Sequence, residues 1–185
     1  MNFASGVNPG GNSLRGHMSQ EEAIYYCSNL YMSQLGAEYY IEHNGKTNKY
    51  SDAMQISNVT CFKDSKYNLT CPITSKVLSA SAINLKRAKK IGEVITEEEV
   101  KGVMLGRCRK VLQIFEKEGC KDIIIGAFGC GSYGLDAKII ASIWNQLFEK
   151  EFYGTFRQVI FSIPCKAGKH AHNHNIFKEV LSELL

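Results

Sequence analysis

The sequence has 185 residues, 44% of them hydrophobic and 22% charged, with a formal net charge of +4. These values are typical of one globular domain with a full core and exclude a disordered chain. The one basic cluster, 86–90, lacks interleaved aromatic residues and is either a solvated segment or an anion-steering patch. With no helix-turn-helix, zinc-finger or ribonucleoprotein pattern, we expect no direct nucleic-acid binding.

No apolar run reaches the roughly 18 residues of a membrane span, and no leader pattern opens the chain. We therefore expect a soluble, cytoplasmic protein without membrane contact. The seven cysteines form no Cys-x-x-Cys pair, and Cys120, Cys130 and Cys165 lie in apolar runs. This usage predicts reduced, mostly buried thiols.

Strand and helix patterns alternate along the chain. Thr96, three residues before Glu99, predicts a capping box, and Gly119 predicts the end of that helix. The apolar run 122–128 predicts a strand buried on both faces, and 38–51 is expected to be a connection. The expected strands are 2–7, 54–62, 76–83, 122–128 and 158–163, and the expected helices are 19–35, 96–118, 136–148 and 175–184. This order predicts a layered α/β fold with a central sheet, in a single domain over 1–185.

A glycine-rich turn near the N-terminus leads into a helix that opens with two carboxylates. Asn8-Pro9-Gly10-Gly11 allows backbone N–H groups to approach a ligand, and Glu21 and Glu22 can move protons on what is bound. By itself, Ser19-Gln20-Glu21-Glu22 fits an ordinary capping box. The second glycine loop, farther along the chain, favours the functional interpretation.

That second loop, 126–134, lies between an expected strand and an expected helix, where glycine-rich backbone can hold an anion. Gly129 to Gly134 also fits the Gly-x-Gly-x-x-Gly dinucleotide fingerprint. A dinucleotide fold, however, needs an acidic residue at the end of the next strand. The acids nearest that spacing, Glu149 and Glu151, fall near a helix end instead, so we do not expect a nicotinamide cofactor.

Taken together, the two loops resemble the microbial type of poly(ADP-ribose) glycohydrolase, built on the macrodomain fold. The resemblance extends from residue 2 to about residue 163 and depends on separate motifs in the same order. These motifs are Asn2-Phe3-Ala4-Ser5, Asn8-Pro9-Gly10-Gly11, Gln20-Glu21-Glu22 and Gly126-Ala127-Phe128-Gly129-Cys130-Gly131-Ser132-Tyr133-Gly134.

The resemblance implies a macrodomain-like three-layer α/β/α fold with a mixed central sheet. It also implies a hydrolase that cleaves ribose–ribose O-glycosidic bonds and releases ADP-ribose. Glu22 would be the catalytic acid and base, Glu21 would orient the ribose, and Asn8 would hold a ribose hydroxyl. Further substrate-binding positions implied are Gly10, Gly11, Gln20, Gly129, Cys130, Gly131, Ser132, Tyr133 and Gly134. Repulsion from Glu21 is expected to raise the pKa of Glu22.

The sequence departs from the family pattern in two places. Asn12 replaces a third glycine, and its side chain would crowd a close approach of phosphate. The strands that precede Asn2 in the family, with part of the adenine pocket, are not present. The sequence is then a reduced version or a shortened piece, or a partner or second copy covers the open N-terminal sheet edge. Two alternatives remain open: a module that binds ADP-ribose without cleaving it, and a hydrolase of mono-ADP-ribosyl groups.

His170, His172 and His174, near Cys165, alternate in what is expected to be an extended loop. Such a loop can place three imidazoles on one side, as a zinc site requires. Because no partner with standard spacing follows, we interpret these histidines as surface residues. No metal and no cofactor is expected.

Overall fold

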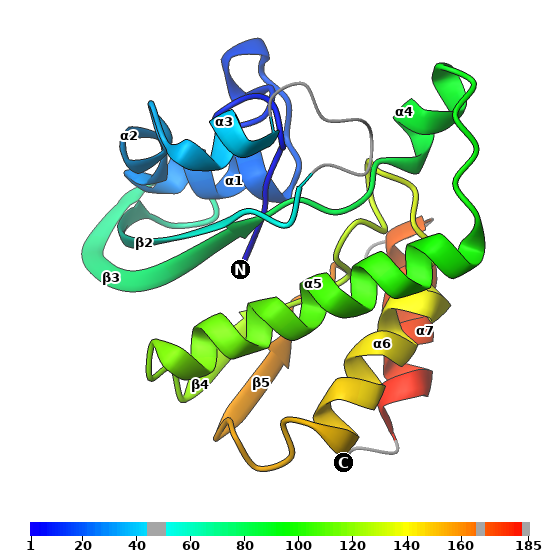
Figure 1. Ribbon diagram of the computed structural model, residues 1–185. Coiled ribbons are helices and arrows are strands. Elements are labelled where there is room, and N and C mark those ends of the chain that lie inside the picture. The colour runs from blue at the N-terminus through cyan, green and yellow to red at the C-terminus, as the bar shows by residue number, and fades with distance from the viewer. Residues whose placement is uncertain (44–50, 166–168, 183–185) are drawn as a thin grey trace. The chain divides into compact units, whose positions relative to one another are not determined.

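The computed structural model of the chain describes residues 1–43, 51–165 and 169–182 (Figure 1). The chain divides into two compact units, Met1–Ser81 and Ala82–Leu185, which we describe separately. The expectation of a single domain over the whole chain stays a prediction.

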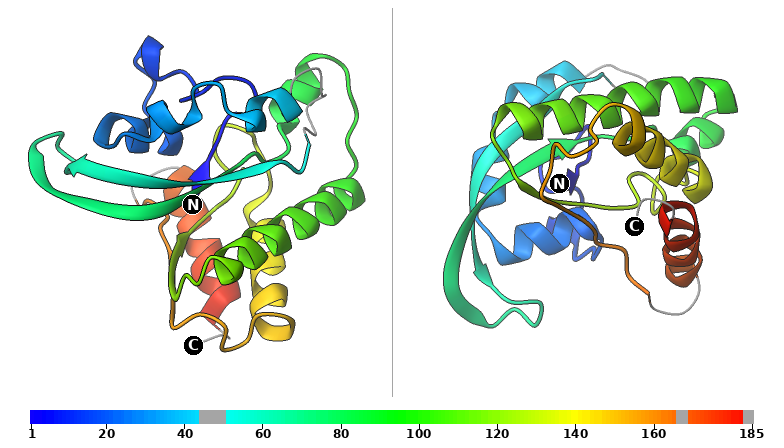
Figure 2. Two further views of the ribbon diagram at one scale, coloured as in Figure 1. Left: turned by 60° about the vertical axis from the view of Figure 1, so that its left-hand side comes forward. Right: turned by 90° about the horizontal axis from the view of Figure 1, so that it is seen from below.

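The first unit contains a three-stranded mixed sheet in the order β1-β3-β2. Its strands are β1 (Asn2–Phe3), β2 (Met54–Lys63) and β3 (Leu69–Ala80). β1 pairs with β3 in parallel, and β2 pairs with β3 in an antiparallel manner. Figures 1 and 2 show β2 and β3 as a long curved ribbon with the helices of this unit on one face. Those helices are η1 (Ser13–Arg15), α1 (Gln20–Cys27), α2 (Leu30–Gln34) and α3 (Glu38–His43).

The helix expected over 19–35 is divided into α1 and α2, and this prediction was wrong. Ser28 has extended backbone angles (φ −146°, ψ 177°) and forms a bridge with Cys61 of β2. Asn29 bonds β2 through its side-chain oxygen, which accepts from the Thr60 N–H at 2.9 Å. Pairing with the sheet therefore replaces one helical turn. The connection expected over 38–51 contains α3, and its residues 44–50 lie outside the described ranges.

The described residues of the second unit form two parallel strands and four helices. β4 (Asp122–Ile125) pairs with β5 (Gln158–Phe161), and the intervening chain forms the crossover helix. Figure 2 shows α6 and α7 running beside one another. The helices are α4 (Leu85–Lys90), α5 (Glu97–Lys117), α6 (Ala137–Lys150) and α7 (Lys169–Leu181). The expected cap of α5 is confirmed, because the Thr96 and Glu99 side chains each accept a hydrogen bond from the other residue's N–H.

Three expectations for strands and helices are corrected. The strand expected over 122–128 is not buried on both faces, since Ile124 is 56% exposed. β3 begins at Leu69, seven residues earlier than expected, and its first part is exposed. α7 begins at Lys169 rather than 175, so His172 and His174 lie on a helix. Residues two apart on a helix point about 200° apart, and the alternate spacing therefore does not align their imidazoles.

The seven cysteines are all free thiols. Only Cys108 and Cys130 are buried, so the expectation of mostly buried thiols was wrong. In the part of the chain that the structure describes, every helix is too short or too polar to cross a membrane.

Candidate active site

The turn after β1 is built from two glycines in left-handed conformation, Gly10 (φ 72°) and Gly11 (φ 60°). It is closed by the Gly11 N–H, which donates to the Asn8 carbonyl at 2.9 Å. A Cβ on Gly10 would lie 2.4 Å from the ring of Tyr25 in α1. The turn is therefore packed directly against the helix that carries the two carboxylates, and only glycine fits there.

Glu21 and Glu22 both reach back to this turn. The Glu21 Oε2 accepts from the Ser5 N–H at 2.8 Å, and the Glu22 Oε1 accepts from the Asn12 N–H at 2.9 Å. A Cβ on Gly11 would lie 2.5 Å from the Glu22 Oε1 and 2.7 Å from the Glu21 Oε2. Gly11 is thus the position over which the two carboxyl groups converge.

The two carboxyl groups differ in protonation. Burial raises the pKa of Glu21 to about 8. The hydrogen bond from the Ser5 N–H lowers this pKa, and the nearby Glu22 charge raises it. For Glu22, burial also raises the pKa, but hydrogen bonds from Ser19 and Asn12 outweigh it and the net pKa is lowered. The expectation that Glu21 raises the pKa of Glu22 was therefore wrong. At neutral pH the proton is on Glu21, and Glu22 is ionised.

The capping box expected at the start of α1 is present, with the Ser19 N–H donating to the Glu22 Oε2 at 3.1 Å. The Ser19 hydroxyl donates to the same oxygen. Glu22 therefore closes the helix cap and contacts the glycine turn with the same carboxylate. The structural and functional interpretations of this residue are compatible.

Asn12 does not need the left-handed backbone that a glycine would allow. Its φ is −112°, and its carbonyl accepts from the Arg15 N–H at 2.9 Å as η1 begins. Its N–H is the donor to Glu22 described above. The replacement of glycine at this position is therefore compatible with the backbone of the turn.

Gln20 and Asn8, two of the expected substrate-binding residues, make hydrogen bonds within the N-terminal segment. The Gln20 amide donates to the Met1 carbonyl at 2.8 Å and accepts from the Phe3 N–H at 2.8 Å, so it holds β1. Asn8 is exposed, and its N–H donates to the Ser5 Oγ at 3.1 Å. Their roles toward substrate stay predictions.

A buried polar chain, not anticipated from the sequence, lies behind Glu21. The Asn2 side chain opposes the rise in the Glu21 pKa, and its Nδ2 donates to the Ser79 Oγ at 3.0 Å. The Gln34 Nε2 donates to the same hydroxyl at 2.5 Å, and the Tyr40 hydroxyl donates to the Gln34 Oε1. These residues come from β1, β3, α2 and α3. No local sequence pattern connects them, because only the folded sheet brings them together.

The second loop connects β4 to α6 within the second unit. Gly129 has φ 80°, and a Cβ there would lie 2.5 Å from Leu135 and 2.7 Å from Ala82. Cys130 is fully buried, whereas Gly131 and Ser132 are exposed. The loop is closed by the Leu135 N–H, which donates to the Gly129 carbonyl at 3.1 Å.

The N-terminus of α6 is already occupied by a carboxylate. The Asp136 side chain accepts from the N–H groups of Lys138 and Ile139, at 2.8 and 3.1 Å. A phosphate at this loop would therefore depend on loop backbone groups more than on the helix dipole. The two glycine loops belong to different units of the chain.

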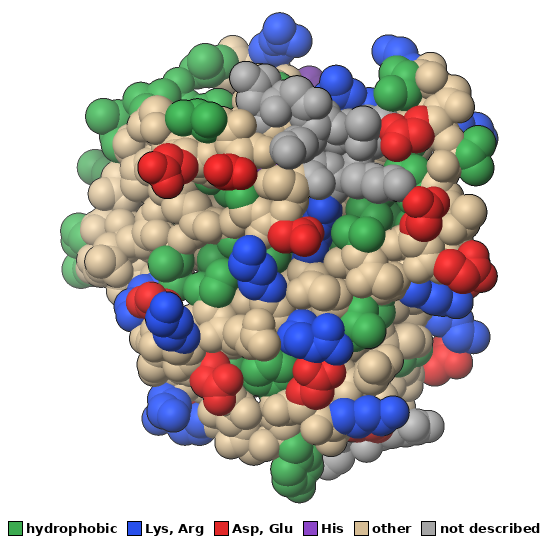
Figure 3. Space-filling model, in the orientation of Figure 1, with side chains coloured by type: hydrophobic (Ala, Val, Ile, Leu, Met, Phe, Trp, Pro, Cys, Tyr) green, Lys and Arg blue, Asp and Glu red, His purple; other side chains and the backbone are tan. Residues whose placement is uncertain are grey.

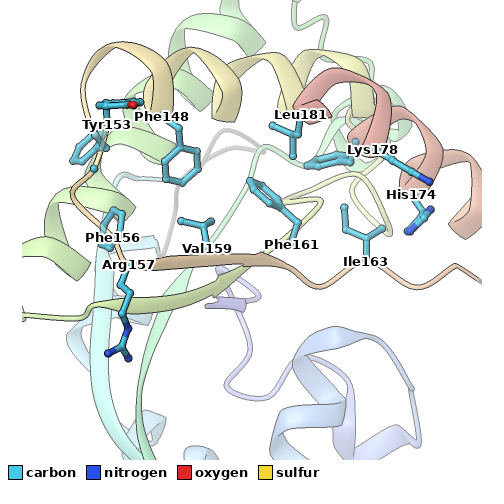
Figure 4. A pocket seen from close by; sticks show the side chains of 13 residues that line it. Phe148, Tyr153, Phe156, Arg157, Val159, Phe161, Ile163, His174, Lys178 and Leu181 are labelled. Atoms are coloured by element: carbon cyan, nitrogen blue, oxygen red, sulfur yellow. The ribbon is translucent and has the colours of Figure 1, made fainter. Parts of the chain in front are cut away.

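A separate apolar groove of about 520 Å³ lies where β5 faces α6 and α7 (Figure 4). Val159 and Phe161 point into it from the strand, and Phe148 points into it from α6. Arg157, at its edge, points away and pairs with Asp122. The groove is lined mainly by hydrocarbon and aromatic groups, and we assign no chemistry to it.

Charge is mixed over the face of the molecule shown in Figure 3, where Lys and Arg side chains alternate with Asp and Glu. Within the described ranges, no three His, Cys, Asp or Glu side chains are grouped so that they could hold a metal ion.

The mixed α/β fold and these two glycine loops define a class of protein, the macrodomain-like proteins. A family model described as the microbial-type PARG catalytic domain matches residues 1–64. The poly(ADP-ribose) glycohydrolase (PARG) of Thermomonospora curvata is 32% identical with a TM-score of 0.88, and the match covers 97% of this chain and 66% of that one. Bound to the inhibitor ADP-HPD, the T. curvata protein gives 32% identity and a TM-score of 0.88, over 96% of this chain and 68% of that one.

The Deinococcus radiodurans glycohydrolase in complex with ADP-ribose is 28% identical with a TM-score of 0.89, over 99% of this chain and 74% of that one. No curated protein matches the chain. The chain belongs to the microbial-type poly(ADP-ribose) glycohydrolase family, and the expected fold class is confirmed. It spans about two thirds to three quarters of the length of these relatives.

Proposed function

We propose that the chain is a hydrolase that cleaves ribose–ribose O-glycosidic bonds of poly(ADP-ribose) and releases ADP-ribose. The observation that carries the proposal is the pair of buried carboxyl groups at Gly11, one with a pKa of about 8 and one with a lowered pKa. Glycosidic bond cleavage needs a carboxyl group that gives a proton to the leaving oxygen and a base that then activates water. The relatives bound to ADP-ribose and to ADP-HPD support the choice of ligand.

Glu22 acts as the acid and then the base. It is ionised in the ligand-free chain, and the negative diphosphate of a bound substrate raises its pKa, so that it takes up a proton. It then gives this proton to the leaving ribose oxygen as the oxocarbenium-like centre forms. The resulting carboxylate removes a proton from the attacking water, which returns Glu22 to its protonated form.

Glu21 binds the ribose as a neutral carboxyl group. Its Oε1 is buried without a hydrogen-bond partner among the described residues, so it is available to a ribose hydroxyl. Because Glu21 is neutral, it does not add a second negative charge beside the substrate diphosphate. The loop 129–134 binds that diphosphate, Asn8 holds a ribose hydroxyl, and Tyr133 packs on ribose.

The test is release of ADP-ribose from poly(ADP-ribose) by the unmutated chain, by Glu22→Gln and by the exposed control Glu38→Gln. We expect Glu22→Gln to lose about 10²–10⁴-fold in rate, the range of general acid–base catalysis. It should still bind ADP-ribose, and Glu38→Gln should match the unmutated chain. An unmutated chain that binds the polymer and releases nothing would disprove the enzyme function.

That last outcome would favour the second candidate, a module that binds ADP-ribose without cleaving it. The observation in its favour is that both Glu22 oxygens are already hydrogen-bonded, which stabilises the ionised form. A mono-ADP-ribosylated protein as a parallel substrate separates polymer hydrolysis from removal of mono-ADP-ribosyl groups.

A further inference from the structure

The helix α4 carries four cations in five residues, Lys86, Arg87, Lys89 and Lys90, all of them exposed. In the described part of the chain, no carboxylate pairs with any of the four. This is the basic cluster that the sequence presented as either a solvated segment or an anion-steering patch. The proposed reaction leaves it unused.

Helix stability does not account for all four charges. Arg87, Lys89 and Lys90 lie in the last turn of α4, where cations interact favourably with the helix dipole. Lys86 is the second residue of the helix, where the same dipole disfavours a cation. The cluster therefore carries more positive charge, and carries it closer to the N-terminal end, than the helix itself requires.

The N-terminal end of α4 is joined to the second glycine loop inside the unit Ala82–Leu185. The Lys86 N–H donates to the Tyr133 carbonyl at 3.2 Å. A Cβ on Gly134 would lie 3.1 Å from Lys86 Cγ and 3.5 Å from its Cε, so the lysine stem lies across the end of the loop. The loop and the basic helix form one continuous surface.

We propose that α4 binds the diphosphate of the next ADP-ribose unit when the loop 129–134 holds one unit of the polymer. This inference depends on the proposed function and specifies its substrate as a polymer of at least two units. Each unit of such a polymer contributes a diphosphate, so anions recur along the chain at the spacing of one unit. Clustered lysine and arginine are the side chains that neutralise such a backbone.

The experiment measures dissociation constants for ADP-ribose and for a defined-length ADP-ribose oligomer, in a Glu22→Gln background that prevents turnover. The test variant is Arg87→Ala/Lys89→Ala/Lys90→Ala, which leaves the Lys86 stem in place against Gly134. The matched control is Lys117→Ala/Lys121→Ala/Lys150→Ala, which removes three exposed lysines: the last residue of α5, the residue before β4 and the last residue of α6.

We expect the α4 variant to bind the oligomer about tenfold more weakly, with less than a twofold change for ADP-ribose, and with a smaller salt dependence. The control variant should match the background for both ligands. Equal weakening of both ligands, or no weakening of the oligomer, would overturn the inference. The inference would also be overturned if a single-stranded oligonucleotide of equal charge bound α4 as tightly as the ADP-ribose oligomer does.

The two failures are distinguishable. A chain that binds neither ADP-ribose nor the oligomer refutes the proposed function, and the inference fails with it. A chain that binds ADP-ribose and releases it from polymer, while the α4 variant binds oligomer normally, refutes only the inference. Thermal unfolding of each variant without ligand shows whether lost binding is lost folding.

Discussion

Gly11 has a tightly constrained position in the candidate site, because a Cβ there would overlap both carboxyl groups. Its φ of 60° disfavours other residues, and any side chain would overlap the Glu22 and Glu21 oxygens. Gly16 has a similar backbone (φ 75°) with no atom within 4 Å of the point that a Cβ would occupy. The two glycines therefore allow backbone strain to be separated from the clash with the carboxylates.

Gly11→Ala should lose at least 100-fold in rate of ADP-ribose release, because the methyl group displaces Glu22 from the Asn12 N–H. Gly16→Ala carries the same left-handed strain, about 1 kcal/mol, and should keep most of its activity. Steady-state rates and thermal unfolding of both variants check this. Equal rates in the two variants would show that contact with the carboxylates is irrelevant.

Glu21 makes the stability of the chain depend on pH. Its folded pKa of about 8 lies above the ordinary value of 4.5, so the folded state keeps a proton that the unfolded state loses. The corresponding stabilisation is present below pH 4.5 and is lost as the pH rises to about 8. It amounts to roughly 3–5 kcal/mol over the full range.

We therefore expect the free energy of unfolding of Glu21→Gln to change less between pH 5 and pH 8 than that of the unmutated chain. Urea unfolding at several pH values measures the difference, and Glu38→Gln is the control for an exposed carboxyl. If the free energy of unfolding changed with pH in the same way in the unmutated chain and in Glu21→Gln, the proton that the folded state keeps would not be on Glu21.

The strands and helices of the first unit meet at a buried hydroxyl rather than at an apolar contact alone. Ser79 in β3 accepts from Asn2 in β1 and from Gln34 in α2, so one oxygen joins three elements. Buried donors that lose their acceptor destabilise a protein more than the bond itself contributes. This hydroxyl consequently holds β1 and the residues beside Glu21 in position.

Ser79→Ala should lower the free energy of unfolding by about 2–4 kcal/mol, because two buried N–H donors lose their acceptor. Ser75→Ala, four residues earlier on the same face of β3 and exposed, should change it by less than about 0.5 kcal/mol. Denaturant unfolding of both variants tests this. A near-neutral Ser79→Ala would mean that water or a shifted side chain replaces the hydroxyl.

The chain as a whole is two compact units, each with its own sheet and its own glycine loop. If the loop of the second unit binds diphosphate, ligand binding should stabilise the folded chain by mass action. The backbone of that loop depends on Gly129, whereas Gly154, also in the second unit, has φ 69° with open space around it.

ADP-ribose at 100 times its dissociation constant should stabilise the unmutated chain by about 2.7 kcal/mol. Gly154→Ala should keep this stabilisation and Gly129→Ala should lose it, because the new methyl group would overlap Leu135 and Ala82. Calorimetry with and without ligand measures both. A full ligand-induced shift in folded Gly129→Ala would contradict a role for the loop in binding.

Much of the fold could be predicted where neighbouring residues decide the conformation. The start of α5 at Thr96 and Glu99, and its end near Gly119, follow from capping and glycine geometry within a few residues. The break of α1 after Cys27 could not be predicted in this way, because Asn29 bonds Thr60, which is 31 residues away. Pairing with a distant strand outweighed local helix propensity.

The sequence by itself determined the caps, the glycine turns and the family of the protein, because these depend on residues close together in the chain. The tertiary structure alone decided which carboxyl group holds the proton. Folding brings Ser5 to Glu21 and Asn12 to Glu22, and these hydrogen bonds act together with burial and with the local Ser19 hydrogen bonds to set the two pKa values. Protonation in a buried pair depends on surroundings that span the fold, and adjacent positions in a sequence do not contain that information.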